Sequence, residues 1–190
     1  MDSNDTLSRM TERDARDWSD PKAIELLEDW HSRVYAAQAA HYASADRFRL
    51  ANYIVGVPAI IFSSIVGTAI FAGLEKNSRV AWLFALVSIL AAILAGLQTF
   101  LRFSERATQH ATAGDWFSAV RRDIEEILHL PVDCRGKVKD CLDRFRKEIN
   151  RAAQDAPELR SKFWKREARR FRVKEPPLRT KRITLGQKAR

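Results

Sequence analysis

The sequence predicts an all-α membrane protein, in which a two-helix transmembrane hairpin extends into a cytoplasmic antiparallel helical bundle. Residues 50–74 form a run of 25 without a charged side chain, and residues 80–101 form a second run of 22. Only the five residues 75–79 separate the two runs. A helix needs about 20 apolar residues, each rising about 1.5 Å, to cross the hydrocarbon core. Both runs reach that length, and helices satisfy internally the backbone hydrogen bonds that lipid cannot provide.

The alternative to a membrane hairpin is a pair of core helices in a soluble protein. In a soluble protein, a helix that is apolar on every side must be buried on every side. A chain of 190 residues has too few other residues to bury two such helices. We therefore expect a multi-pass plasma-membrane protein with two spans. Five arginines flank the spans and only two basic residues lie in the loop, which favours a cytoplasmic location for both termini.

The residues before the first span predict one long cytoplasmic helix. Residues 1–19 are polar and are expected to be disordered, whereas Asp20 can cap a helix that has Pro21 in its first turn. The segment 20–49 then carries a seam whose spacing alternates between three and four residues, which predicts packing against another helix. The seam consists of Leu27, Trp30, Val34, Ala37, His41, Ser44 and Phe48.

The first span contains a pair of residues that favours a helix kink. Pro58 removes a backbone donor, and Gly56 adds local freedom. Small residues also recur at four-residue spacing in both spans, and such rows let helices approach closely in lipid. These assembly rows either hold the hairpin to itself or pack between subunits. They are Ala59, Ser63 and Gly67 in the first span and Ser88, Ala92 and Gly96 in the second.

Residues 102–156 predict cytoplasmic helices that continue the second span without a break before Pro131. Asp133 is expected to cap a shorter helix that runs to Asn150. Each helix has an apolar face, typical of packing in a bundle. The two faces are Phe103, Ala107, His110, Gly114, Phe117, Arg121, Ile124 and Leu128, and then Val138, Leu142, Phe145 and Ile149.

Residues 157–190 are predicted to form a basic tail. Residues 160–190 hold 13 basic and 2 acidic groups. Phe163, Trp164 and Phe171 are interleaved with the basic residues, a pattern that favours binding to anionic lipid headgroups. A solvated or partner-binding tail is the second interpretation, and nucleic acid is the least favoured. The basic residues singled out are Lys165, Arg166, Arg169 and Arg170.

No catalytic pattern stands out, so we expect neither an enzyme nor a cofactor. The sequence has no P-loop, glycine-rich nucleotide turn, HExxH or nucleophile elbow. His41 lies eight residues before one flanking arginine and His110 eight after the other, so the two are expected at similar heights on neighbouring helices. A facing pair could sense pH or bind a metal. Two histidines are too few ligands for a usual metal site, so hydrogen bonds to Tyr42 or to the backbone are the favoured interpretation. Cys134 and Cys141 do not have the spacing of a zinc site.

Conduction by this chain would need several copies. The spans hold no ionisable side chain apart from Tyr53 at an edge, which argues against a transporter. A homo-oligomer surrounded by membrane lipids could line a pore with hydroxyls and an amide, from Ser63, Ser64, Thr68 and Gln98. Four arginines at the cytoplasmic face are expected to anchor at headgroups or to contact phosphates, namely Arg102, Arg106, Arg121 and Arg122.

Three stretches resemble the SLATT-domain family of two-span bacterial proteins. Residues 49–58 read R-x-x-N-Y-x-x-G-x-P and residues 63–71 read S-S-x-x-G-T-x-x-F, which is similar to the first span of that family. Residues 98–110, Q-x-F-L-R-F-x-E-R-A-x-x-H, resemble the exit from its second span. The likeness covers roughly residues 22–150 by the order of the elements.

The resemblance implies an oligomeric effector that forms a pore or disrupts the bacterial inner membrane. Such a protein would be the killing arm of an antiphage system in which a partner enzyme makes a cyclic oligonucleotide during infection. Because this sequence offers no segment for a separate sensor domain, the chain would bind the nucleotide second messenger through its own helices or take its signal from a sensor or synthase partner. The alternative is a non-conducting membrane scaffold that binds a partner protein or anionic lipid through its cytoplasmic helices and basic tail.

Overall fold

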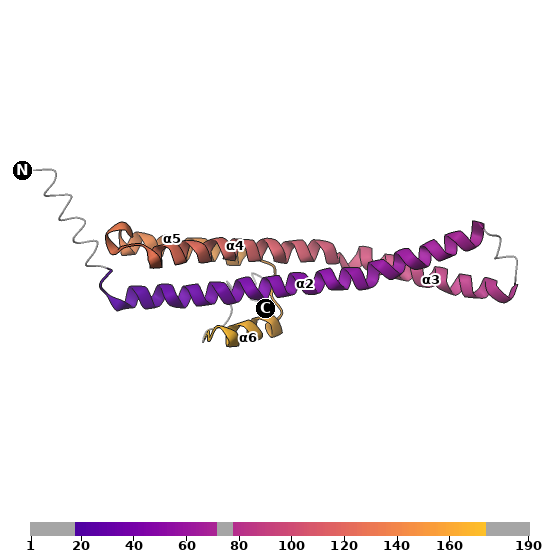
Figure 1. Cartoon of the computed structure of the whole chain (residues 1–190), viewed down its shortest axis with the longest axis horizontal. Helices are drawn as coiled ribbons and strands as arrows, with labels where there is room; N and C mark the ends of the chain where they lie inside the picture. Colours follow the sequence, from indigo (N-terminus) through magenta and orange to yellow (C-terminus); the bar gives the residue numbers. More distant parts are fainter. Residues whose placement is uncertain (1–17, 72–77, 174–190) are drawn as a thin grey trace, which may run out of the picture. The chain divides into compact units, whose positions relative to one another are not determined.

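The computed structural model describes residues 18–71 and 78–173, and all regular structure in these ranges is helical (Figure 1). The all-α class is therefore confirmed. The predicted loop 75–79 falls largely outside the described residues, as does the end of the predicted tail. The elements are α2 (Pro21–Phe71), α3 (Ser78–Leu101), α4 (Phe103–His129), the short 3-10 helix η2 (Val132–Cys134), α5 (Val138–Asp155) and α6 (Ser161–Arg170).

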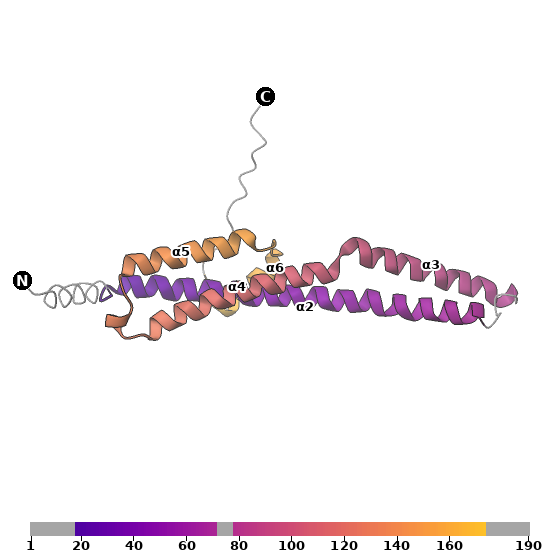
Figure 2. The same ribbon diagram turned by 90° about the horizontal axis from the view of Figure 1, so that it is seen from above.

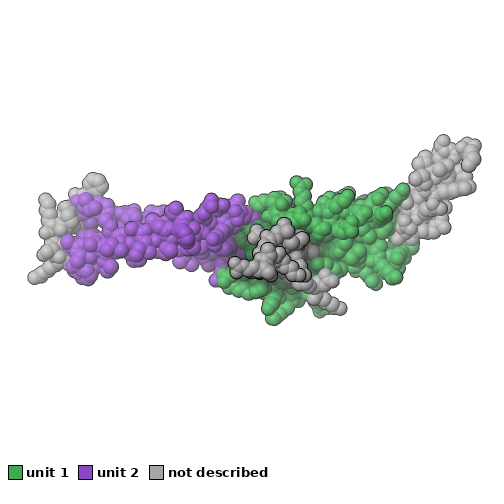
Figure 3. Space-filling view, turned by 180° about the vertical axis from the view of Figure 1, so that it is seen from behind, with its two compact units in different colours: residues 1–43, 110–190 green, residues 44–109 purple. Residues whose placement is uncertain are grey.

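The chain divides into two compact units, which Figure 3 colours separately. Unit 1 comprises residues 1–43 and 110–190, and unit 2 comprises residues 44–109. Unit 1 holds the first part of α2, most of α4, and all of α5 and α6. Unit 2 holds the apolar hairpin that α2 and α3 form.

The first part of α2 follows the sequence prediction. Pro21 is its first residue, and the backbone N–H of Lys22 donates to Oδ1 of Asp20 at 3.0 Å. Every position of the predicted seam is buried or half-buried, which confirms the seam as a packing face. These positions are Leu27, Trp30, Val34, Ala37, His41, Ser44 and Phe48.

Trp18 departs from the disorder predicted for residues 1–19. Its side chain is only 4% exposed, and its Nε1–H donates to the carbonyl oxygen of Gly136 at 2.7 Å. Tryptophan combines a large apolar body with one N–H donor, so a site that covers the ring and accepts the proton holds it firmly. The prediction for residues 1–17 lies outside the described part of the chain.

The core of unit 1 lies where α2, α4, α5 and α6 meet. Leu27 of α2, Phe117 and Ile124 of α4, and Phe145 of α5 are each at most 2% exposed, and Trp164 of α6 joins the same cluster. Full burial of one such side chain contributes roughly 1.5–3 kcal/mol. Unit 1 is therefore held by apolar packing between helices that are far apart in the sequence.

The connection from α4 to α5 differs from the prediction. Asp133 lies in η2, and α5 begins only at Val138, after Gly136, whose φ of 71° is left-handed. Glycine adopts this conformation without the clash that a Cβ would cause, so the chain turns there and the predicted Asp133 cap is wrong. Helix α5 runs to Asp155, beyond its predicted end, and its predicted apolar face packs in or against the core.

The predicted basic tail contains a helix that packs onto unit 1. The ring of Phe171, just after α6, lies 4.2 Å from the ring of Tyr35 on α2. The aromatic residues that the sequence shows interleaved with the basic ones are buried or half-buried, because their spacing places them on one face of the helix. Four basic residues, Lys165, Arg166, Arg169 and Arg170, are exposed on the other face, and Phe163, Trp164, Glu167 and Ala168 are buried.

The second long helix is broken at Arg102, where the sequence predicts continuity as far as Pro131. The step between α3 and α4 is visible in Figure 2. Arg102 has a φ of 48°, a left-handed conformation that costs a residue with a Cβ about 1–2 kcal/mol. The backbone N–H of Arg102 still donates to Gln98, and that of Arg106 to Arg102, so the joint keeps its hydrogen bonds.

Candidate functional site

The hairpin of unit 2 directs large apolar side chains outward. Only 17% and 6% of the most apolar stretches of the two candidate spans are buried, whereas a core helix of a soluble protein is mostly buried. Both helices are long and apolar enough to cross a membrane. Side chains that are more than half exposed include Ile54, Ile60, Ile70, Trp82, Leu86, Ile93 and Phe100.

The inner contact of the hairpin uses small residues, although mostly not the predicted ones. Ala59 and Ala69 of α2 and Ala91 of α3 are each 5–6% exposed. A Cβ added to Gly56 would lie 2.8 Å from Nε2 of Gln98, too close for an unshifted contact. Gly56 therefore permits a close approach between α2 and α3, a role different from the kink predicted for it.

A polar contact crosses the hairpin beside Gly56. Nε2 of Gln98 donates to Oδ1 of Asn52 at 3.4 Å. Interhelical hydrogen bonds of this kind contribute about 0.6–2 kcal/mol in lipid. Gln98 thus faces α2, and α2 runs unbroken through Pro58, where the kink stays a prediction.

Five of the six predicted assembly residues lie off the inner contact. Ser63, Ser88 and Ala92 are exposed. A Cβ on Gly67 or on Gly96 would meet no heavy atom within 4 Å among the described residues, apart from the adjoining residues and backbone of its own helix. The interpretation that these five hold the hairpin to itself is therefore wrong, whereas packing between subunits stays a prediction. Within one chain, the contact between α2 and α3 uses Gly56, Ala59, Ala69 and Ala91, of which only Ala59 belongs to the predicted rows.

The hydroxyl groups predicted to line a pore are on the exposed side of α2. Ser64 donates to the carbonyl of Ile60 at 2.9 Å, and Thr68 donates to the carbonyl of Ser64 at 2.8 Å. Ser63 is also exposed. Each of these two hydroxyls donates its hydrogen bond within its own helix, and its oxygen can still accept one. Gln98 does not join this group, because its amide is engaged across the hairpin.

His41 of α2 and His110 of α4 meet inside unit 1, as their positions along the sequence predict. Their Nδ1 atoms lie 3.1 Å apart, a hydrogen bond in which one ring donates and the other accepts. The two side chains are 2% and 6% exposed. The ring of Phe117 stacks on His41, with 5.5 Å between the ring centroids. The facing of the pair is confirmed, and the contact is buried.

The surroundings keep both histidine rings neutral. Burial lowers the pKa of His41 to about 3, with repulsion from His110 as the second cause, and burial also lowers the pKa of His110. Tyr42 was one of the partners predicted for the histidine rings, but its hydroxyl bonds elsewhere. Its hydroxyl donates to Oδ1 of Asp115 at 2.6 Å, and this hydrogen bond raises the pKa of Tyr42. A Cβ on Gly114 would lie 2.7 Å from the Tyr42 ring, so close contact again depends on glycine.

The four arginines predicted to contact phosphate have separate local roles. Arg121 pairs with Glu125 at 3.3 Å, and Arg122 donates to the hydroxyl of a serine one turn earlier. Arg102 pairs with a glutamate one turn later, and Arg106 is exposed. Arg102 and Arg106 belong to unit 2, whereas Arg121 and Arg122 belong to unit 1, and the contact of these residues with phosphate stays a prediction.

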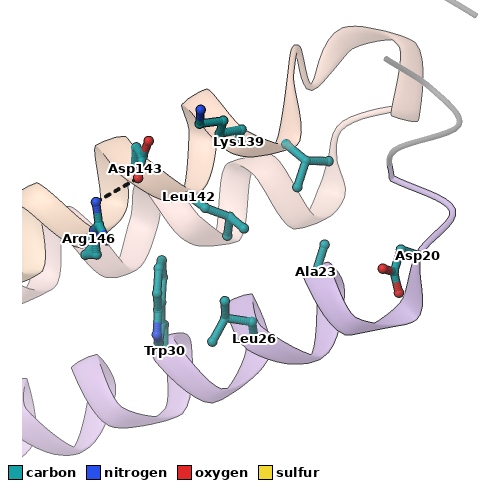
Figure 4. Close-up of a pocket in the computed structure, with 9 residues that line it drawn as sticks. Asp20, Ala23, Leu26, Trp30, Lys139, Leu142, Asp143 and Arg146 are labelled. Carbon is teal, nitrogen blue, oxygen red and sulfur yellow. Dashed lines mark hydrogen bonds and ion pairs between the residues drawn. The ribbon is translucent and has the colours of Figure 1, made fainter. Parts of the chain in front are cut away.

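A cleft between the start of α2 and α5, lined by both apolar and charged side chains, was missed by the sequence analysis (Figure 4). Its volume is about 610 Å³. In Figure 4, Leu26 and Trp30 of α2 and Leu142 of α5 extend into the gap between the two helices. Asp143 and Arg146 form an ion pair of 2.9 Å at its rim. The signal in the sequence was the apolar Leu26, which lies off the seam on the same helix and is 38% exposed.

The described residues contain no group of three or more His, Cys, Asp or Glu that could hold a metal ion. Cys134 and Cys141 are both free thiols, the first exposed and the second buried. Burial raises the pKa of the Cys141 thiol, which disfavours its thiolate.

Comparison with known proteins identified no match: no family model, curated protein or solved structure resembles the chain closely enough to be significant. The likeness to SLATT domains rests on the sequence motifs alone.

Proposed function

We propose that the chain is an oligomeric effector of the bacterial inner membrane, which forms a pore or disrupts the bilayer as the killing arm of an antiphage system. The exposed apolar face of the hairpin supports a membrane location, because each Å² of apolar surface removed from water contributes about 25 cal/mol. The basic residues around the spans support cytoplasmic termini.

The observation that carries the proposal is that five of the six small residues in the predicted assembly rows lie off the inner contact. Gly67 on α2 and Gly96 on α3 have open space where a side chain would be, and Ser63 and Ser88 beside them are exposed. In lipid, such rows provide close backbone packing and interhelical contacts. A second copy of the hairpin is the partner that this surface fits, so the proposed assembly is built by α2 and α3 of neighbouring subunits.

The proposed pore uses the hydroxyl side of α2. Ser63, Ser64 and Thr68 lie within six residues of one another on an exposed stretch of the helix. Several copies arranged around an axis would present rings of acceptor oxygens to water and ions. The signal that opens the pore would reach unit 1 either as a nucleotide second messenger or through a sensor or synthase partner.

A voltage-sensitive dye in bacteria that express the chain, alone and with any neighbouring synthase, tests the proposal. We expect fast depolarisation, and we expect Gly67→Ile to abolish it because added bulk blocks close packing between subunits. Leu86→Phe is the matched control, since it adds bulk at an exposed position outside the rows. An unchanged potential in both conditions, with the protein confirmed in the membrane, would overturn the pore.

A second candidate, the non-conducting scaffold, is favoured by the cleft between α2 and α5. Its apolar floor of Leu26, Trp30 and Leu142 suits an apolar side chain from a partner protein. Under this hypothesis Leu26→Asp abolishes activity in phage challenge, while Gly67→Ile has no effect. The reverse pattern would rule out the scaffold. Deletion of 160–190 is a poor test, because it would also remove Trp164 from the core.

A further inference from the structure

Helix α6 carries a concentrated positive charge on its exposed side. Residues 160–172 contain seven basic residues and a single acidic one, Glu167. Glu167 is 4% exposed and pairs with Arg166 at 2.7 Å, so it is withdrawn from the surface. The basic face of α6 is defined here as Arg160, Lys162, Lys165, Arg166, Arg169 and Arg170, all of them exposed.

The other side of α6 fixes this basic face in place. Phe163, Trp164 and Ala168 are 5–9% exposed, and Trp164 and Ala168 belong to the core cluster of unit 1. The backbone N–H of Val173 donates to the carbonyl of Ala168 at 2.8 Å and closes the end of the helix. Because the aromatic side chains are committed to the core, a partner of the basic face is bound by charge and hydrogen bonds, without insertion of an aromatic anchor.

The direction of α6 places its first turn near the segment that leads to the apolar span. Phe171, at the end of α6, contacts Tyr35 of α2. Within unit 1, α6 runs antiparallel to α2 (Figure 1), so its first residues lie toward the end of unit 1 where α2 continues into residues 44–71.

We infer that the basic face of α6 docks on anionic lipid headgroups of the membrane in which the hairpin lies. Guanidinium groups form paired hydrogen bonds with phosphate oxygens, and the negative potential of the cytoplasmic leaflet attracts clustered basic residues. Nucleic acid offers the same phosphate chemistry, but the lipid is held at high effective concentration by the spans. The inference rests on the proposed membrane location and is independent of whether the hairpin conducts.

Headgroup quenching in nanodiscs measures this docking on the full chain. A fluorophore is attached at Ser161→Cys in a background of Cys134→Ser and Cys141→Ala. Quenching by a nitroxide on the lipid headgroup is then compared between neutral discs and discs with about 30% anionic phosphatidylglycerol. We expect severalfold stronger quenching in the anionic discs, reversed by about 0.5 M salt because the interaction is screened.

Two charge variants of equal size locate the docking surface. The test variant removes four charges from the basic face, and the control removes four exposed charges near the start of α5. We expect the test variant to weaken docking by on the order of 100-fold or more and the control to retain it. The substitutions are Lys165→Gln, Arg166→Gln, Arg169→Gln and Arg170→Gln in the test variant, and Lys137→Gln, Lys139→Gln, Arg144→Gln and Lys147→Gln in the control.

Three outcomes would overturn the inference. Equal quenching in neutral and anionic discs excludes charge-driven docking, and equal loss in both variants excludes α6 as its location. Binding of single-stranded DNA that depends on the same four residues, without any lipid dependence, would assign the face to nucleic acid. A failure of membrane location itself is distinguished separately, because a chain that is not a membrane protein would not be incorporated into the discs.

Discussion

Two buried histidines give unit 1 a polar contact in the middle of an apolar interface. His41 and His110 bond through their Nδ1 atoms at 3.1 Å. A shift of α2 against α4 by one turn would separate these atoms and place a buried polar ring against apolar neighbours, at a cost of about 1–3 kcal/mol. The contact therefore favours one register between α2 and α4, whereas apolar packing alone discriminates poorly between registers.

The histidine pair predicts a stability that falls in acid. The pKa of His41 is lowered to about 3 and that of His110 is also lowered, so protons bind more tightly to the unfolded chain, where a histidine has a pKa of about 6.5. The stability that the buried neutral rings contribute is fully present above about pH 6.5, the unfolded pKa. It is lost as the pH falls toward the folded pKa, by up to about 1.4 kcal/mol per pH unit for each histidine. Unfolding of the full chain in detergent, followed by tryptophan fluorescence from about pH 7.5 to pH 5, measures this slope.

Replacing both rings isolates the effect of the pair. In His41→Leu/His110→Leu neither buried ring remains to titrate, so the pH slope should flatten while the fold is retained, because removing both partners of a hydrogen bond together costs little. His129→Gln alters an exposed histidine on the same helix and should leave the slope as it is. Equal slopes in the double variant and the unmodified chain would contradict the assignment.

At the scale of elements, the hairpin has two kinds of glycine. Gly56 lies at the contact between α2 and α3, where a Cβ would press on Gln98 at 2.8 Å. Gly67 lies on the same helix with open space around it. The residue type is the same at both places, and only the neighbouring helix distinguishes them.

This difference predicts opposite effects of one substitution at the two glycines. Gly56→Leu should destabilise the hairpin by about 1–3 kcal/mol, because it overpacks the contact and displaces the Gln98 amide from Asn52. Gly67→Leu should change the stability of a single hairpin by less than about 0.5 kcal/mol and should instead weaken self-association. Unfolding in mixed detergent reports the first effect, and crosslinking at increasing protein-to-lipid ratio reports the second.

The comparison includes its own control. Gly56→Ala is the smallest change at the contact and should cost less than Gly56→Leu, since the end of the Gln98 side chain can move aside. If Gly67→Leu destabilised the hairpin as much as Gly56→Leu, the described contact between α2 and α3 would be wrong.

At the scale of the whole molecule, the two units divide the chain by chemistry. Unit 2 exposes apolar side chains, whereas unit 1 buries its own around a core drawn from four helices. Helices α2 and α4 contribute residues to both units. A unit with an apolar surface and a unit with a buried apolar core are therefore parts of continuous helices.

The proposed topology predicts the labelling of the two natural cysteines. Cys134 is exposed and lies after the second apolar run, so a membrane-impermeant maleimide should not reach it in intact spheroplasts but should label it after permeabilisation. Cys141 should react slowly in both cases, because it is buried and its pKa is raised by burial. In a cysteine-free background, Ser78→Cys should be labelled in intact spheroplasts, and fast labelling of Cys134 there would contradict cytoplasmic termini.

Local patterns anticipated much of the fold. Asp20 and Pro21 predicted the start of α2, and equal sequence distances from the spans predicted the meeting of His41 with His110. Such features depend on helix geometry, which has one period and one rise, and on the short turn that makes α2 and the following helices antiparallel. The left-handed conformation of Arg102 had no such signal, because arginine is not a residue that favours it.

The sequence by itself determined the two long apolar runs and most of the faces that the helices bury, because the length of a run and its apolar periodicity can be read from the residues alone. It did not determine the break at Arg102, which separates α3 from α4. Only the tertiary structure decided which of several similar faces meets a neighbour. It placed Gly56 rather than Gly67 at the inner contact, anchored Trp18 on Gly136, and turned the aromatic side of α6 into the core. These choices depend on the summed packing of segments far apart in the chain, and no short pattern of residues encodes that sum.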